Sequence, residues 1–109
     1  MTIVEQIKSL NLRKGQIVES AEISSALEKK YGTNPTSVLL ADLSYNRTNK
    51  GINFEKHPHL FEFIKPGVYK YLGENYPYTG NVYKREDEAD EDIIIGKWED
   101  GKLIEFSEK

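Results

Sequence analysis

Apolar side chains recur at intervals of three and four residues in two stretches near the N-terminus. They are Ile3, Ile7 and Leu10 in the first stretch, and Ile23, Leu27 and Tyr31 in the second. This spacing is typical of amphipathic helices. Thr2 and Glu5 form a capping box before the first stretch, and Gly32 follows the second, where glycine favours helix termination. We therefore expect helices over residues 3–10 and 20–31.

A third helix is predicted from Pro35 to Tyr45. Asn34 is a good N-cap, and proline suits the first helical position. The residues expected to face the core are Val38, Ala41 and Tyr45, with Leu39 or Leu43 beside them. Only residues 32–34 separate this helix from the one before it. Two helices joined by so short a glycine-containing turn indicate a helix-turn-helix.

Alternation of apolar and polar residues predicts strands in the rest of the chain. Residues 16–19 form a short extended stretch, and residues 60–64 and 68–72 flank a Lys-Pro-Gly turn. Residues 93–98 and 102–106 flank an Asp-Gly turn, which favours a second hairpin. This order predicts an α+β fold, a winged helix in which three helices are covered by a β-hairpin wing, with an extra C-terminal β-hairpin.

The charge distribution divides the chain into two parts. Residues 1–85 hold 12 basic and 8 acidic residues, a net charge of +4, whereas residues 86–109 hold 3 basic and 10 acidic residues, a net charge of −7. Such asymmetry points to nucleic acid or to an acidic interaction tail, although solvated surface is the alternative. We expect a winged-helix domain over residues 1–85. The acidic linker and hairpin over 86–109 would pack on that domain or at an oligomer interface.

Composition excludes several classes of protein. The 109 residues contain 38% hydrophobic residues and no cysteine. A disulfide scaffold, thiolate zinc sites and cysteine catalysis are therefore excluded. No apolar run approaches the roughly 18 residues of a membrane span, and the N-terminus does not resemble a signal peptide. The sequence thus favours a cytoplasmic protein.

The outer face of the predicted third helix is the first candidate DNA contact, because the second helix of a helix-turn-helix enters the major groove. Its candidate residues are Thr36, Ser37, Leu40 and Ser44. Hydroxyl groups can bind phosphates or base edges, and a leucine can touch a thymine methyl group. The helix has no lysine or arginine, and it carries Asp42, so strong guanine readout from it is not expected.

Basic and polar residues after this helix are the second candidate contact. Arg47, Asn49 and Lys50 form a compact donor cluster, and Lys65 and Lys70 flank the tip of the predicted wing. Arginine can bind a phosphate or guanine through two hydrogen bonds, and asparagine can pair with adenine. The alternative is ordinary positive charge at a helix C-terminus and along a strand. Lysines and arginines at positions 13, 14, 29 and 30 are set aside as remote.

Two segments resemble a known kind of module. The stretches ADLSYNRTNKGI (Ala41 to Ile52) and HLFEFIKPGVYKYLG (His59 to Gly73) are similar to winged-helix modules of bacterial and phage restriction-type and mobile-element proteins. The similarity covers roughly residues 3–85. It implies DNA binding, with Arg47, Asn49 and Lys50 at the positions of the polar motif. Those modules occur fused to nucleases, whereas no nuclease domain follows here.

Catalytic and metal-binding patterns are weak. The chain lacks phosphate-loop, nucleophile-elbow and metalloprotease motifs, so we expect no enzyme and no cofactor. His57 and His59 lack a third ligand at a fixed spacing, and the acidic run over 86–92 lacks the spacing of a calcium loop. The tyrosines over 76–83 can stack on unpaired bases, but the sequence favours packing within the domain.

Two functions remain open from the sequence. The first is a non-catalytic protein that binds duplex DNA. The second is an acidic protein-binding inhibitor or adaptor of the phage counter-defence type, acting by charge mimicry or strand pairing. In either case the C-terminal hairpin can pair with a protein partner or a second copy of the chain. Its candidate contacts are Ile93, Ile95, Trp98 and Phe106.

Overall fold

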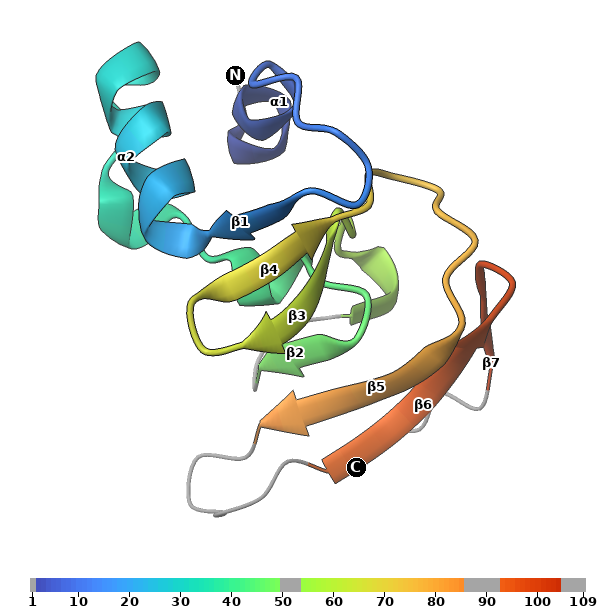
Figure 1. The fold of residues 1–109 in the computed structure, drawn as a ribbon. Helices are drawn as coiled ribbons and strands as arrows, with labels where there is room; N and C mark the ends of the chain where they lie inside the picture. The colour runs from blue at the N-terminus through green and yellow to red at the C-terminus, as the bar shows by residue number, and fades with distance from the viewer. Residues whose placement is uncertain (1, 50–53, 86–92, 105–109) are drawn as a thin grey trace.

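A computed structural model describes residues 2–49, 54–85 and 93–104, and within them the chain forms two β-sheets with short helices (Figure 1). The helices are α1 (Ile3–Lys8) and α2 (Ser20–Tyr31), with the 3-10 helices η1 (Pro35–Ser37), η2 (Leu40–Leu43) and η3 (Phe54–Lys56). The strands are β1 (Ile17–Glu19), β2 (Arg47–Asn49), β3 (Phe61–Lys65), β4 (Val68–Tyr71), β5 (Gly80–Arg85), β6 (Ile93–Glu99) and β7 (Lys102–Ile104).

The first sheet has the antiparallel order β1-β4-β3. Val18 of β1 and Phe63 of β3 lie opposite Tyr69 of β4, on its two sides. Both α-helices lie at the β1 end of the molecule (Figure 1). The core between these elements consists of Ile7, Val18, Ile23, Leu27, Val38, Leu40, Leu43, Leu60, Phe61 and Tyr69. Burial of this apolar surface is the main stabilising contribution at this end.

The second sheet has the order β2-β5-β6-β7, in which β2 is parallel to β5 and the other pairs are antiparallel. The predicted Asp-Gly hairpin is present, with φ of 49° at Asp100 and 84° at Gly101. Positive φ at both central residues is the requirement of a type I′ turn. A side chain at position 101 would also lie 3.1 Å from the Cα of Pro77, so glycine is needed there for space as well.

The segment Ser44–Asn46 joins the two sheets. The Tyr45 N–H donates to the Phe61 carbonyl at 2.7 Å, and the Tyr83 N–H donates to the Asn46 carbonyl at 3.0 Å. The Asn46 side chain adds two bonds to one residue of β3. Its Oδ1 accepts from the Phe63 N–H at 2.7 Å, and its Nδ2 donates to the Phe63 carbonyl at 3.0 Å. An amide side chain therefore takes the position of a paired strand residue.

The first two predicted helices are confirmed. The Thr2–Glu5 capping box is formed in both directions, with the Glu5 N–H donating to Thr2 Oγ1 at 3.1 Å and the Thr2 N–H donating to Glu5 Oε1 at 3.0 Å. Gly32 ends α2 in the left-handed conformation, with φ of 70°, and its N–H donates to the Glu28 carbonyl at 2.8 Å. The first helix ends at Lys8, before the predicted end at Leu10.

The predicted third helix, Pro35 to Tyr45, is wrong. Asn34 and Pro35 begin only the single 3-10 turn η1, after which Val38 and Leu39 adopt extended ψ values of 96° and 88°. Val38 and Leu40 are both buried, and Leu39 between them is 57% exposed. One face of an α-helix cannot bury residues two positions apart, because successive residues turn by about 100°. Core packing therefore overrides the local helical signals.

The winged-helix fold class is also wrong, because the described chain consists mainly of two sheets and has no third α-helix. The wing hairpin and its third strand β1 are present. However, residues 47–49 form β2 and residues 80–85 form β5, and the sequence pattern predicts neither strand. β5 pairs with both β2 and β6. The parallel pairing of β2 with β5 joins distant parts of the chain and has no local sequence signal.

A candidate binding pocket lined by aromatic rings

The predicted third-helix contacts separate into exposed and buried residues. Thr36 and Ser37 are exposed, whereas Leu40 and Ser44 are 2% and 0% exposed. The Ser44 hydroxyl donates to the Leu40 carbonyl at 2.9 Å, so its hydrogen bond is made inside the protein. The expected outer face of Thr36, Ser37, Leu40 and Ser44 is therefore not a surface of this molecule.

The basic cluster is also partly engaged within the chain. The Arg47 guanidinium lies 4.4 Å from the ring centre of Phe63, and the Asn49 Nδ2 donates to Asp42 Oδ1 at 2.7 Å. Lys65 is exposed. Lys50 lies outside the described residues.

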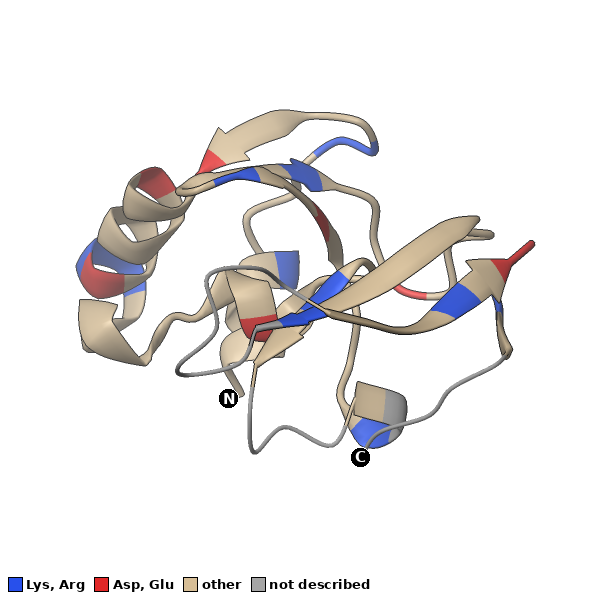
Figure 2. Cartoon of the chain, turned by 90° about the horizontal axis from the view of Figure 1, so that it is seen from below, with Lys and Arg blue, Asp and Glu red and all other residues tan. Residues whose placement is uncertain are grey.

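Lys70 pairs with a glutamate of the neighbouring strand, at 3.8 Å between its Nζ and Glu62 Oε1. Figure 2 shows lysine and arginine positions spread over helices, strands and loops, with acidic positions between them. Of the predicted cations that the structure describes, Arg47 and Lys70 thus contact other side chains of the chain, whereas Lys65 is exposed. The acidic run over 86–92, on which the inhibitor hypothesis rests, lies outside the described residues.

The candidate partner contacts on the C-terminal hairpin also differ from one another. Ile93 is 43% exposed, whereas Ile95 is buried at 4%. Trp98 is half-buried, and its Nε1 donates to the Tyr45 carbonyl at 2.7 Å. Phe106 lies outside the described residues. Of the candidates that the structure describes, only Ile93 is therefore positioned as an exposed apolar contact, and Trp98 belongs to a different site.

That site is a cavity of about 210 Å³ at the junction of the two sheets. Its aromatic walls are Tyr45 after η2, His59 before β3, Tyr76 between β4 and β5, and Trp98 of β6. The remaining lining residues are His57, Pro58, Glu74, Asn75 and Gly101. A cavity of this size is smaller than the sites of drug-sized ligands, so it suits a single ring or side chain.

The rings hold one another in fixed orientations. The Trp98 ring meets Tyr45 and His59 edge-on, with ring centres 5.4 and 5.3 Å apart. Phe54 lies behind His59, at 4.3 Å between ring centres, and Tyr78 stacks on Tyr45 at 5.3 Å. Tilted and edge-on contacts of this kind stabilise aromatic clusters. The walls of the pocket are therefore preorganised by a second layer of rings.

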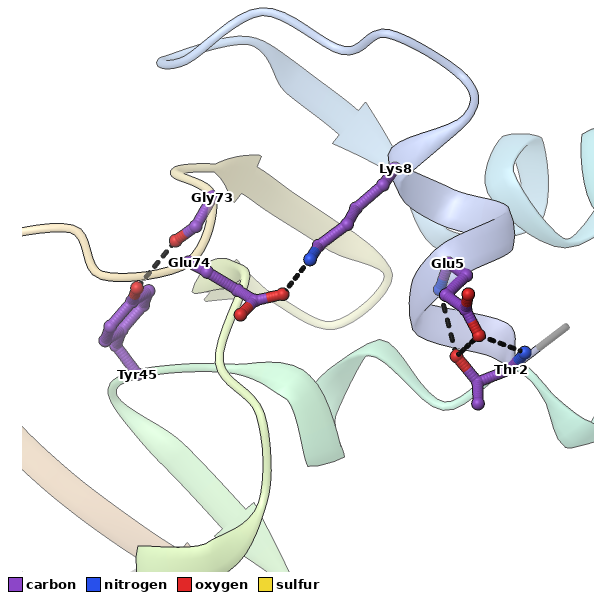
Figure 3. A network of polar contacts seen from close by, with 6 residues as sticks. All are labelled: Thr2, Glu5, Lys8, Tyr45, Gly73 and Glu74. Carbon is purple, nitrogen blue, oxygen red and sulfur yellow. Dashed lines mark hydrogen bonds and ion pairs between the residues drawn. The ribbon is translucent and has the colours of Figure 1, made fainter.

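Polar contacts fix the side of the pocket that carries Glu74 and Tyr76, and Figure 3 shows two of them, between Tyr45 and Gly73 and between Glu74 and Lys8. The Tyr45 hydroxyl donates to the Gly73 carbonyl at 2.6 Å and accepts from the Tyr76 N–H at 3.0 Å. Burial raises the pKa of Tyr45, so this hydroxyl remains a donor at neutral pH. Glu74 forms an ion pair with Lys8 of α1, and this contact raises the pKa of Lys8. The negative charge of Glu74 at the rim is thus compensated.

His59 contributes an unused polar atom. Its Nδ1 is buried and has no hydrogen-bond partner. Burial lowers the pKa of His59 to about 4 and outweighs the backbone carbonyls of Ser44 and Phe54, which favour the charged form. At neutral pH the imidazole is therefore uncharged. A buried polar atom without a partner costs free energy, so this nitrogen makes the fold locally less stable than a paired one would.

A basic depression lies beside the pocket. It is lined by Arg13, Lys14, Gly15 and Gln16, and the turn is closed by the Gln16 N–H, which donates to the Arg13 carbonyl at 3.0 Å. The Cε of Lys14 lies 3.9 Å from the position that a Cβ would take on Gly73, whose carbonyl binds the Tyr45 hydroxyl. Lys14, which the sequence analysis sets aside, therefore lies close to Gly73 at the edge of the pocket.

The sequence does not predict the pocket, because its walls come from four separate segments. The sequence shows only separate parts of it. His57 and His59 suggest a metal site, and the tyrosines over 76–83 suggest stacking. Within residues 2–49, 54–85 and 93–104 no group of three metal-ligating side chains comes together. In the tyrosine segment Tyr78 is buried, as packing predicts, but Tyr76 lines the pocket and Tyr83 is 38% exposed.

Comparison with known proteins places the chain in a family. A profile described as a domain of unknown function, DUF7225, matches residues 2–105. The chain belongs to the DUF7225 family. The uncharacterized protein YnaC of Bacillus subtilis (strain 168) is 47% identical to this DUF7225 chain over 102 residues, which cover 93% of the chain and 38% of YnaC. The chain thus spans well under half the length of this relative. No solved structure matches it significantly.

The descriptions of the family and of YnaC name neither DNA nor a protein partner. DNA binding and protein binding therefore remain hypotheses for this DUF7225 chain. None of the helices in the described ranges has the length and apolar character needed to cross a bilayer.

Proposed function

We propose that this domain is a non-catalytic nucleic-acid-binding module that takes one unpaired base into the aromatic pocket. The observation that supports the proposal is the cavity of about 210 Å³ that is lined by the aromatic side chains of Tyr45, His59, Tyr76 and Trp98. A nucleobase combines a flat apolar face with hydrogen-bonding edges. Aromatic side chains bind the face by stacking.

The charges around the pocket favour a ligand with an anionic backbone. Arg13 and Lys14 line the depression next to the Gly73 corner, and Glu74 is compensated by Lys8. Phosphate contacts position a nucleic acid, and base contacts specify it. Asp100, in the turn on the opposite rim, repels phosphate. The phosphate backbone of the nucleic acid is therefore expected to pass on the side of Arg13 and Lys14.

An unpaired strand is favoured over duplex DNA. Groove reading by a helix-turn-helix needs an α-helix behind the turn, and the segment over 35–45 contains only short 3-10 turns. An unpaired base, in contrast, needs only a platform for stacking. The proposal therefore differs from the sequence prediction in two ways: the site is the aromatic pocket in place of a helix-turn-helix, and the ligand is an unpaired strand in place of duplex DNA.

Replacing Tyr76 with alanine is expected to weaken binding of a short single-stranded oligonucleotide by about 5- to 150-fold, because stacking contributes about 1–3 kcal/mol per base. The chain has one tryptophan, and it lines the pocket, so quenching of Trp98 fluorescence reports occupancy directly. The matched control is Tyr83→Ala, which removes an exposed tyrosine outside the pocket. Circular dichroism checks that both variants fold.

Three results would contradict the proposal. The first is the absence of quenching by any oligonucleotide, and the second is equal loss in the two tyrosine variants. The third is quenching by tetramethylammonium or a trimethyl-lysine peptide in place of nucleotides, because an aromatic cage also suits organic cations. A duplex of the same sequence is expected to bind more weakly than the single strand.

The double variant Arg13→Ala/Lys14→Ala is expected to reduce the salt dependence of binding. Each phosphate contact on a single strand contributes about 0.7 to the slope of log K against log salt, so loss of two contacts should lower the slope by about 1.4. The control is Lys29→Ala/Lys30→Ala, which removes the same charge from the end of α2. An unchanged slope in the first variant would exclude Arg13 and Lys14 as the phosphate contacts.

A further inference from the structure

A second cavity, of about 250 Å³, lies next to the aromatic pocket. Its apolar wall comes from Ile3 and Val4 at the start of α1 and from Leu39 and Leu43 around η2. Leu39 is 57% exposed, although it is a large aliphatic side chain held on a short, well-packed segment. The cavity therefore presents an apolar surface to solvent that the fold itself does not cover.

The two cavities share a wall. His57 and Pro58 line both of them, so a ligand that fills the aromatic pocket reaches the second cavity by passing over one dipeptide. Proteins that bind single strands commonly stack successive bases on successive aromatic side chains, and the imidazole of His57 lines both cavities. The shared wall matches that arrangement, because neighbouring bases of an unpaired strand enter neighbouring sites.

The second cavity also has a specific polar group, the carboxylate of Asp42. Its Oδ1 accepts from the Asn49 Nδ2 at 2.7 Å, which fixes the orientation of the side chain. A carboxylate offers about four acceptor positions and no donor, so it binds further N–H groups. Among base edges, the exocyclic amino groups of cytosine, adenine and guanine are such donors, whereas thymine and uracil carry only carbonyl groups as exocyclic polar groups.

We infer that the second cavity holds the base next to the one in the aromatic pocket, and that Asp42 selects a base with an exocyclic amino group. The inference rests on the proposed function. The cavity is too small for a helix or strand of a partner protein, since even drug-sized ligands occupy about 300–1,000 Å³. A single planar ring with a donor at its edge matches its size, its apolar wall and its acceptor.

The test compares mononucleotides with dinucleotides by quenching of Trp98. The ligands are dTMP, dCMP and the dinucleotides d(TT), d(CT), d(TC) and d(CC). We expect dinucleotides to bind more tightly than mononucleotides. We expect a cytosine in one of the two positions to improve affinity by about 5- to 150-fold over thymine, because one well-placed base contact discriminates by about 1–3 kcal/mol.

Two variants assign these effects to the second cavity. Asp42→Asn keeps the shape and the acceptor for Asn49 and introduces an amide donor, so it should remove the cytosine preference and leave mononucleotide affinity unchanged. Leu39→Ser should reduce the affinity of dinucleotides to that of mononucleotides. Its control is Ile17→Ser, which removes an aliphatic side chain of similar exposure, 55%, on β1.

The outcomes separate the inference from the proposed function. If mononucleotides quench Trp98 but dinucleotides gain nothing, the second site is overturned and the aromatic pocket stands. The second site is likewise overturned if the gain persists in Leu39→Ser, or if the cytosine preference persists in Asp42→Asn. If no nucleotide quenches Trp98 in the wild-type protein, both the pocket function and the second site are overturned.

Discussion

Replacing Phe61 with alanine is expected to lower the free energy of unfolding by about 3–5 kcal/mol. Phe61 is fully buried, and its ring contacts Tyr69 and Tyr71 edge-on, with ring centres 6.1 and 5.5 Å apart. The variant loses this burial and leaves a cavity in the core. Because domains of this size are stable by only about 5–15 kcal/mol, a large fraction of the total would be lost. Urea denaturation monitored by circular dichroism measures the change.

The neighbouring Ile64 provides the control for this prediction. It is on the same strand and is 45% exposed, so Ile64→Ala is expected to change stability by about 0.5 kcal/mol or less. If Phe61→Ala lowers the free energy of unfolding by less than about 1 kcal/mol, the core beside the first sheet does not depend on this ring.

Acidification is expected to destabilise the protein through His59. The pKa of His59 is about 4 in the folded chain, against an ordinary value of 6.5. Between these values the unfolded chain binds a proton on this residue and the folded chain does not, so stability rises with pH over this window. Solvent screening of the partly exposed ring limits the expected effect of this lowered pKa to about 2 kcal/mol.

The measurement is the difference in unfolding free energy between pH 7.5 and pH 4.5, compared between the wild-type protein and His59→Gln. Other groups that titrate in this range affect both proteins, so they cancel in the comparison. The variant is expected to lose less stability on acidification than the wild-type protein. His57→Gln, at the second histidine of the chain, should keep most of the pH dependence. Equal behaviour of wild-type protein and His59→Gln would exclude His59 as the cause.

Local signals in the sequence are enough to predict the elements with strong caps and turns. The capping box at Thr2, the glycine after α2 and the Asp-Gly turn before β7 act within a few residues, so they can be recognised without the fold. The hairpin of β3 and β4 is predictable for the same reason. Together these account for both α-helices and for the outline of both hairpins.

The rest depends on contacts between distant residues. Pro35 with its cap is a genuine helix start, yet burial of Val38 and Leu40 forces an extended break that no local pattern reveals. The polar strand β2 finds its place only by parallel pairing with β5. The pocket is less predictable still, because Tyr45, Tyr76 and Trp98 become its walls only after both sheets have formed.

The two hydrogen bonds from the Asn46 side chain to the Phe63 backbone help to hold the two sheets together. Tyr45, the preceding residue of the chain, is a wall of the pocket and belongs to the same joint between the sheets. The cavity can therefore exist only while this joint is closed. By mass action, any occupant that binds the closed form alone shifts the folding equilibrium toward the native state, in proportion to the logarithm of its concentration above Kd. Under the proposed function, binding in the pocket would therefore also stabilise the packing of the two sheets against each other.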